Sequence, residues 1–270
     1  MVGYSNIFDS DPLPQHGFLY SNGAMTGLGT LPGFDGSYAN AINGSGQVTG
    51  SLAIRIFPEH AFLDTNGIMT DLGTVSGAPF SEANAINNSG QVVGILYTGP
   101  IHGFLFSNGT MTDLGMLLPV GFSSSANSIN DSGQVVGGMG PAFGPEHAFL
   151  YNSGVMTDLG TLPGYLESVA SAINNMGQVV GTSGRLSGSL PNGPTHAFIY
   201  SNGLMVDLNS LIDPSLNITL TGASAINNGG QILASGSGNS YLLTPVPEPS
   251  ASLLSAGGLI ALAAVRCWRK

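Results

Sequence analysis

The sequence has few charged side chains and almost no basic ones. Only 7% of its 270 residues are charged, with fifteen Asp or Glu against five Lys or Arg. All fifteen acidic residues precede residue 250, and Arg55 and Arg185 are the only basic residues in that stretch. Because binding to phosphates requires a basic surface, this composition argues against a nucleic-acid partner and against an anionic membrane surface as the partner of residues 1–249.

Cysteine is scarce as well, and the composition is unfavourable for long helices. Cys267 is the only cysteine, so no disulfide can form within the chain. The sequence holds 41 Gly and 16 Pro, and in a helix interior Gly costs about 1 kcal/mol and Pro about 3 kcal/mol. Hydrophobic residues still make up 42% of the chain. This excludes an intrinsically disordered protein, since disorder goes with low hydrophobicity and high charge.

What the sequence does contain is a repeat that fills most of the chain. Its five histidines all open the same apolar segment, His-(Gly or Ala)-Phe, at spacings of 44, 42, 45 and 49 residues. These histidines are His16, His60, His102, His147 and His196. After a Gly-containing turn comes a run such as Met-Thr-Asp-Leu-Gly at 69–73, and after a variable loop comes Ala-Asn-Ala-Ile-Asn at 83–87. A second turn then leads to Gln-Val-Val-Gly, as at Gln91 and Gln134.

Each repeat unit therefore holds four short apolar or alternating runs separated by turn residues. Asn-Gly and Ser-Gly pairs tolerate the positive φ that tight hairpins need, so each unit predicts four antiparallel strands. Repeats of this length with four strands are typical of propeller blades, and we expect an all-β protein in which residues 1–244 form a β-propeller of about 5–6 four-stranded blades. Small side chains suit the innermost strand, which we assign to Ala-Asn-Ala-Ile-Asn. Gln-Val-Val-Gly, His-Ala-Phe-Leu and Met-Thr-Asp-Leu-Gly follow outwards.

The two ends of the repeat region do not match. The chain opens with Met-Val-Gly-Tyr-Ser at 1–5, which corresponds to the Gln-Val-Val-Gly strand, and the repeat region closes at 241–244 with a copy of the Phe-Leu-Tyr strand. We therefore expect one inner and one outer strand to be missing, and the propeller to be open or truncated at its N-terminus. Residues 1–20 have neither the basic nor the apolar region of a signal peptide. We expect the missing strand and a signal peptide to be encoded upstream.

These motifs resemble a known repeat family. His-Ala-Phe, Met-Thr-Asp-Leu-Gly and Ala-Ile-Asn followed by Gly-Gln-Val-Val-Gly are similar to the bacterial HAF extracellular repeat over residues 1–244. The resemblance implies an exported location, in the cell envelope or outside the cell. It implies no particular chemistry, because the molecular function of that family is not established.

The last 26 residues differ in composition from the repeats. Residues 245–249 form a Pro-rich linker, and residues 250–265 carry no charge. As a helix, these sixteen residues would span about 24 Å, less than the ~30 Å core of a bilayer. We expect a marginal transmembrane helix over 250–265, with the basic residues Arg266, Arg269 and Lys270 as its membrane stop. The alternative is a C-terminal helix buried in the domain.

The order of features in this tail is similar to the PEP-CTERM sorting signal. The resemblance implies that Pro247, Glu248 and Pro249 are the sorting motif, recognised by an exosortase-type membrane protease, and that residues 250–265 anchor the chain transiently in the inner membrane. It also implies exopolysaccharide as a further partner. Tails of this kind also occur under the name of an ice-binding-protein C-terminal domain, a name that is no evidence of ice binding here.

The repeated polar residues could suggest a metal centre or a catalytic site. Equivalent histidines in successive blades lie one blade apart and cannot converge on one zinc ion. The repeated aspartates are expected to cap turns or to guard strand edges, with calcium binding as the alternative. They are Asp71, Asp113, Asp158 and Asp207, and Gly27 replaces Asp in the first copy. The irregular acidic residues, Glu146 and Glu167 among them, form no recognisable catalytic motif, and we assign no catalytic, cofactor-binding or metal-binding residue.

Aromatic residues recur in two places. One per repeat follows the histidine, and we expect these side chains to pack between blades: Phe18, Phe62, Phe104, Phe149 and Phe198. A second set lies in the loops after Asp-Leu-Gly, where the rings could form a platform for sugars or a cap on the core: Phe34, Phe80, Phe122 and Tyr165.

Together these features predict an exported, non-enzymatic surface or extracellular-matrix repeat protein without a cofactor, sorted through its tail and linked to exopolysaccharide or biofilm. Two alternatives remain open. A carbohydrate-active propeller enzyme requires two close carboxylates with raised pKa that break the repeat symmetry. A calcium-dependent adhesive module requires stabilisation by that ion.

Overall fold

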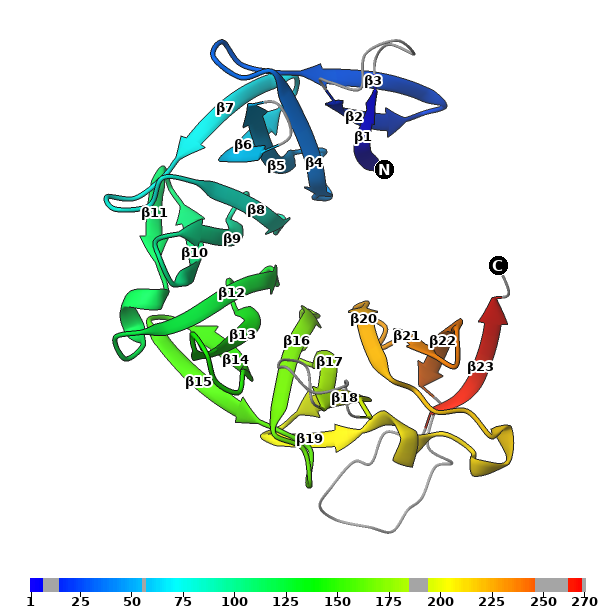
Figure 1. Cartoon of the computed structure of the whole chain (residues 1–270). Helices are drawn as coiled ribbons and strands as arrows, with labels where there is room; N and C mark the ends of the chain where they lie inside the picture. The colour runs from blue at the N-terminus through cyan, green and yellow to red at the C-terminus, as the bar shows by residue number, and fades with distance from the viewer. Residues whose placement is uncertain (7–14, 55–56, 185–193, 246–261, 269–270) are drawn as a thin grey trace. The chain divides into compact units, whose positions relative to one another are not determined.

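The computed structural model describes residues 1–6, 15–54, 57–184, 194–245 and 262–268. Within these ranges the strands pair into six antiparallel sheets, one of three strands and five of four (Figure 1). The predicted all-β fold class is confirmed. The chain divides into two compact units, which are considered separately below. Unit 1 holds Met1–Val135, Met139–Phe143 and Asn152–Val155, and unit 2 holds Val136–Gly138, Gly144–Tyr151 and Met156–Lys270.

The first three sheets belong to unit 1. The three-stranded sheet contains β1 (Val2–Asn6), β2 (Gln15–Ser21) and β3 (Ala24–Gly29). The second contains β4 (Gly36–Ile42), β5 (Val48–Ile54), β6 (Phe57–Thr65) and β7 (Ile68–Gly73). The third contains β8 (Ser81–Ile86), β9 (Val92–Tyr97), β10 (Ile101–Ser107) and β11 (Thr110–Asp113), followed by the short 3₁₀ helix η1 (Gly115–Leu117).

The remaining sheets follow in the same order. The fourth contains β12 (Phe122–Ile129), β13 (Val135–Pro141), β14 (His147–Asn152) and β15 (Val155–Gly160). The fifth contains β16 (Glu167–Ile173), β17 (Val179–Gly184), β18 (His196–Ser201) and β19 (Leu204–Asp207), with the 3₁₀ helices η2 (Leu208–Leu211) and η3 (Pro214–Leu216) after it. The sixth contains β20 (Gly222–Ile226), β21 (Ile232–Gly236), β22 (Asn239–Pro245) and β23 (Leu262–Trp268).

In the four sheets β4–β7, β8–β11, β12–β15 and β16–β19, the strands appear in the order that the repeat predicts. The Ala-Ile-Asn strand lies at one edge, the Gln-Val-Val-Gly and His-Ala-Phe strands follow, and the Met-containing strand lies at the other edge. The hairpin between the last two strands uses a residue with positive φ followed by glycine, as at Asn66 (φ 56°) and Gly67 (φ 80°). Such a turn matches the right-handed twist of the flanking strands.

The two end sheets show one predicted feature and one that was not predicted. β1 pairs with β2 in the place of a Gln-Val-Val-Gly strand, as expected. In the last sheet, β23 pairs antiparallel with β22 and supplies the fourth strand that the repeat pattern lacks. The predicted transmembrane helix is therefore wrong for residues 262–265, and Arg266 lies in a strand opposite Leu242. The physical reason is the free edge of β22, whose unpaired backbone groups accept a further strand.

The rest of the tail lies outside the described residues. This applies to residues 246–261, which include Pro247, Glu248 and Pro249, and to Arg269 and Lys270. In the part of the chain that the structure does describe, no helix has the length and apolar character needed to cross a bilayer.

The core of each unit is built on the repeated phenylalanine. Phe62, Phe104, Phe149 and Phe198 have no exposed surface, which confirms their prediction as core residues, whereas Phe18 in the three-stranded sheet is half-buried. In unit 1, Phe104 packs with Ala83 and Leu96 among others. In unit 2, Phe198 packs with Ala170, Val179 and their neighbours.

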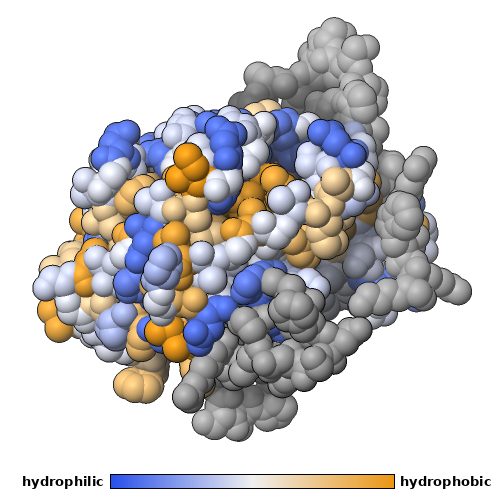
Figure 2. Space-filling model, turned by 90° about the horizontal axis from the view of Figure 1, so that it is seen from above, coloured by the Kyte–Doolittle hydropathy of each residue, from blue (hydrophilic) through white to orange (hydrophobic). Residues whose placement is uncertain are grey.

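The surface reflects the low charge content of the sequence. On the face shown in Figure 2, hydrophobic residues form separate patches between hydrophilic ones. Several large apolar side chains outside the strands are exposed, for example Met116 in η1 and Phe143. Such scattered exposure is normal for a soluble surface and carries no assignment by itself.

The glycine of Gln-Val-Val-Gly is required by close approach of the neighbouring strand. In β8 the register shifts between Ala83 and Ala85, which is a β-bulge opposite Gly94. A Cβ added at Gly94 would overlap the backbone oxygen of Glu82. Gly50 in β5 and Gly181 in β17 face an inner-strand carbonyl in the same way. Glycine at this position of the repeat therefore allows the backbone of the inner strand to approach closely.

This geometry gives a stability prediction with a matched control. We expect Gly94→Ala to lower the free energy of unfolding by about 1–3 kcal/mol, the usual cost of forcing atoms into a packed site. Gly27 has open space around it and no positive φ, so Gly27→Ala should raise the free energy of unfolding by roughly 0.4–1 kcal/mol. Urea denaturation of both variants measures the difference. Equal effects of the two substitutions would contradict the close-approach argument.

Candidate functional site

The repeat histidines and aspartates meet in pairs, eleven residues apart in the sequence. Each imidazole Nδ1 donates to a carboxylate oxygen on the neighbouring strand, and the distances are 2.8 Å for His60–Asp71, 2.9 Å for His102–Asp113, 2.9 Å for His147–Asp158 and 2.6 Å for His196–Asp207. The repeat pattern alone did not predict this pairing. A signal was present, because the first repeat has Gly27 in place of Asp, and there His16 Nε2 lies 3.3 Å from the backbone oxygen of Asp35 instead.

The second oxygen of each aspartate caps the turn that follows its strand. Asp71 Oδ1 accepts a hydrogen bond from Gly73 N at 2.7 Å, and Asp113 Oδ1 accepts one from Gly115 N at 2.8 Å. The predicted turn-cap role of the aspartates is therefore confirmed. With one oxygen on the imidazole and the other on the backbone, each carboxylate holds two strands and a turn together.

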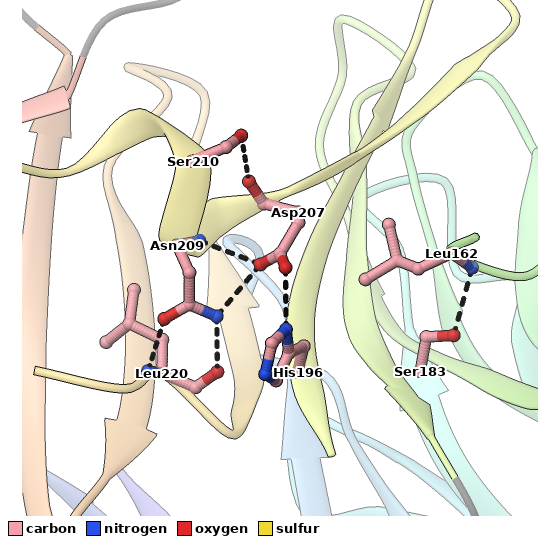
Figure 3. A network of polar contacts seen from close by, with 7 residues as sticks. All are labelled: Leu162, Ser183, His196, Asp207, Asn209, Ser210 and Leu220. Atoms are coloured by element: carbon pink, nitrogen blue, oxygen red, sulfur yellow. Dashed lines mark hydrogen bonds and ion pairs between the residues drawn. The ribbon is translucent and has the colours of Figure 1, made fainter. Parts of the chain in front are cut away.

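The His196–Asp207 pair of unit 2 shows how far this network extends (Figure 3). Asp207 accepts hydrogen bonds from His196 at 2.6 Å and from both the backbone N and the side-chain amide of Asn209, each at 2.8 Å. Asn209 Nδ2 also donates to the backbone oxygen of Leu220 at 3.0 Å, and Asn209 Oδ1 accepts from Leu220 N at 2.7 Å. The contacts of His196 and Asp207 therefore stabilise the local fold.

A serine in the inner strands β4, β8 and β16 joins consecutive repeats. Ser81 Oγ accepts a hydrogen bond from Ala61 N at 2.9 Å and donates to Gly73 O at 2.6 Å. Ser37 makes the same two contacts in unit 1, and Ser168 makes them in unit 2. Each hydroxyl thus bridges the ends of the His-containing and Met-containing strands of the preceding repeat.

The asparagine of Ala-Ile-Asn makes a second link between repeats. Asn87 Oδ1 accepts from Ser89 N at 3.1 Å and from Gln91 N at 2.9 Å. Its Nδ2 donates to Gln91 Oε1 at 2.7 Å and to the backbone oxygen of Asn130 at 3.0 Å. Asn43 repeats this pattern in unit 1 and Asn174 in unit 2. The Asn-x-x-Gly-Gln motif is therefore explained by hydrogen bonds within and between repeats.

These contacts account for the repeated polar residues without a bound ion. Among the residues that the structure describes, no three His, Cys, Asp or Glu side chains are grouped so that they could hold a metal ion. The calcium-dependent alternative stays a prediction, because it concerns solution behaviour that the fold does not test.

Two acidic residues that do not follow the repeat come together in unit 2. Glu146 precedes His147, Glu167 opens β16, and Ser168 N donates to the backbone oxygen of Glu146 at 2.8 Å. Glu167 is only 5% exposed, and the Glu146 carboxylate lies against Gly138. Burial, followed by the charge of Glu167, raises the pKa of Glu146. Glu146 and Glu167 break the repeat symmetry, as the enzyme alternative requires, and glycoside hydrolysis at the pair stays a prediction.

The loop aromatics differ from one another in their surroundings. Phe34 lies 5.5 Å from the ring of His60, and Tyr165 lies 5.3 Å from the ring of His196, as centroid distances. Both also pack against a core cluster, so the cap alternative is confirmed for them. Phe80 differs, because it is 37% exposed and its ring lies 6.3 Å from that of Tyr97.

Comparisons with known proteins give structures but no family. No protein-family model matches the sequence, and a search of curated proteins finds no match. One solved structure similar to this chain is a puromycin-hydrolysing peptidase of Mycobacterium tuberculosis, at 14% identity and a TM-score of 0.47, covering 93% of this chain and 43% of that one. Another is an acylaminoacyl peptidase of Pyrococcus horikoshii, at 13% identity and a TM-score of 0.47, covering 92% of this chain and 42% of that one.

This finding corrects one expectation. Both structures are peptidases, which contradicts the prediction of a non-enzymatic surface or matrix protein, and we withdraw that prediction. The chain spans less than half the length of either peptidase. At this identity and TM-score, no peptidase activity and no catalytic residue is carried over to it.

The His–Asp pairs should contribute to stability according to their burial. His102 and Asp113 side chains are each 13% exposed, whereas Asp158 is 49% exposed. We expect Asp113→Ala to lower the free energy of unfolding by about 1–3 kcal/mol, because it leaves a partly buried imidazole and a backbone N–H without their acceptor. Asp158→Ala should cost less than about 1 kcal/mol, as for exposed ion pairs. Chemical denaturation tests this order, and a larger loss in Asp158→Ala would contradict it.

The carboxylate pair predicts a pH dependence of stability. Because the pKa of Glu146 is raised in the folded protein, the folded state holds this proton to higher pH than the unfolded state. The free energy of unfolding therefore falls as pH rises from the ordinary glutamate pKa through the raised value. We expect Glu146→Gln to raise the melting temperature at pH 7 and to have a smaller effect at pH 4.

Glu59→Gln is the matched control, since Glu59 stands at the same place before His60. Its melting temperatures at the two pH values give the effect of the same substitution outside the Glu146–Glu167 pair. A melting temperature of Glu146→Gln that follows the wild type at both pH values would contradict the raised pKa of Glu146.

Proposed function

We propose that this chain is an exported repeat protein whose HAF-type repeats form a β-propeller, and that an exosortase-type membrane protease sorts it to the cell envelope or the exterior. The observation that carries the proposal is the order of the tail: Pro247, Glu248 and Pro249, then an uncharged stretch, then Arg266, Arg269 and Lys270. Exopolysaccharide is the proposed partner at that location.

The fold supports the propeller part of this proposal. Four-stranded sheets recur with the same strand order, and the serine and asparagine links join each repeat to the next within a unit. Propeller blades have this strand count and this sequential order. The scarcity of Lys and Arg before residue 250 favours a neutral partner over an anionic one.

The proposal places a requirement on the tail. Residues 262–268 pair with β22 in the structure, so contact of this segment with a membrane requires that β23 separate from β22. The proposal names a location and a partner, and it holds whether the protein only binds that partner or also acts on it through Glu146 and Glu167.

The sorting motif can be tested in the native host with the chromosomal gene. We expect Glu248→Ala to leave the chain at full length and attached to the membrane fraction, because the protease loses the only acidic residue of the motif. Immunoblots of the membrane and culture fractions measure length and location. Ser250→Ala, just outside the motif, is the control and should be processed like the wild type. Normal shortening and release of Glu248→Ala would show that the sorting proposal is wrong.

A further inference from the structure

Phe80 departs from the repeat in a way that the fold does not require. In the loop before the inner strand, Phe34 N donates to Leu31 O at 3.1 Å and Tyr165 N donates to Leu162 O at 3.1 Å. The equivalent bond in the second repeat comes from Ala78 N, which donates to Val75 O at 3.0 Å. Ala78, which is buried, thus takes the place of Phe34 and Tyr165 in this loop. The aromatic residue of the loop is Phe80, two positions later, and its side chain is partly exposed.

The shifted ring meets two further side chains that the other repeats lack. Tyr97 N at the end of β9 donates to Phe80 O at 3.0 Å, and the two rings contact each other edge to face at an interplanar angle of 74°. The carboxylate of Glu82, the second residue of β8, interacts with the Tyr97 side chain, and burial, followed by the charge of this carboxylate, raises the pKa of Tyr97. Glu82 near the start of β8 and Tyr97 at the end of β9 thus lie at the same end of these paired strands in unit 1, next to Phe80.

The equivalent positions of the first repeat show that the repeat fold forms without this group. There the three places are taken by Gly36, Tyr38 and Ala53, with Gly36 paired to Ala53 across the two strands. The group therefore does not belong to the hydrogen bonds and core contacts that build every repeat. Positions that break a structural repeat are the natural places to look for a ligand.

We propose that Phe80, Glu82 and Tyr97 form a binding subsite for one neutral sugar residue of a polysaccharide, an inference that rests on the proposed exopolysaccharide partner. A half-exposed aromatic ring offers an apolar face to the C–H groups of a pyranose. A carboxylate accepts charge-assisted hydrogen bonds from sugar hydroxyls, and a phenol can both donate and accept. A neutral sugar fits better than a uronic acid, because the chain carries a net charge of −10.

The experiment is electrophoresis of the purified chain in native gels that contain a polysaccharide. The probes are exopolysaccharide purified from the native host, the neutral polymers dextran and galactomannan, and the acidic polymer alginate. We expect retardation by the host polymer and by at least one neutral polymer. Phe80→Ala should raise the apparent dissociation constant roughly tenfold, the size of one well-placed aromatic contact, and Glu82→Gln should raise it as well.

Phe143→Ala is the matched control, because this fully exposed loop phenylalanine of unit 1 lies outside the subsite. It should bind like the wild type, and melting temperatures of all three variants check that they are folded. If the wild type is retarded and both subsite variants bind equally well, the subsite is wrong while the partner stands. If only alginate retards the chain, the neutral-sugar assignment is wrong. If no polymer retards it while Glu248→Ala still blocks processing, the partner and the subsite fail and the sorting proposal stands.

Discussion

The structure depends on buried amide side chains that use all of their hydrogen-bonding capacity. Asn87 accepts two backbone hydrogen bonds and donates two, one within its own repeat and one to the next. An unpaired amide at such a buried position costs about 1–3 kcal/mol. Asn87, Asn130 and Asn174 are all nearly inaccessible to solvent. Register within the hairpin and contact with the following repeat are therefore set by the same side chain.

Hydrogen bonds between polar side chains matter more in this protein because only 7% of its residues are charged. Chains with many Lys and Glu can place ion pairs on every exposed strand, whereas among the described residues of this chain the repeated contacts between ionisable side chains are the His–Asp pairs. A single pair of this kind could be mistaken for part of a catalytic site. Its recurrence with the same turn cap in successive repeats shows that it is an element of the fold. Residues that break the pattern, such as Glu146 with Glu167 and Phe80 with Tyr97, then become the candidates for function.

The tail shows how one segment can satisfy two physical requirements. An apolar run with few charges suits a bilayer, and it suits equally well a strand that must cover a free sheet edge. Periodicity cannot separate these outcomes in so short a run. The free edge of β22 is a property of the assembled sheet, and it is this edge that accepts Leu262–Trp268 as β23.

The sequence by itself determined the all-β class, the four strands of each repeat, the turns and most of the core, because alternation, Asn-Gly turns and the recurring phenylalanine act over a few residues. It also predicts a sorting motif, which lies outside the described residues and stays a prediction. Only the tertiary structure decided which unrepeated side chains meet. Glu82 reaches Tyr97, and Glu146 reaches Glu167, across strands whose register depends on bulges and on loops of unequal length. The repeat spacings vary between 42 and 49 residues, so the sequence alone does not show which of these side chains face each other. The pairing of β23 with β22 depends on a free strand edge that exists only after the last sheet has formed.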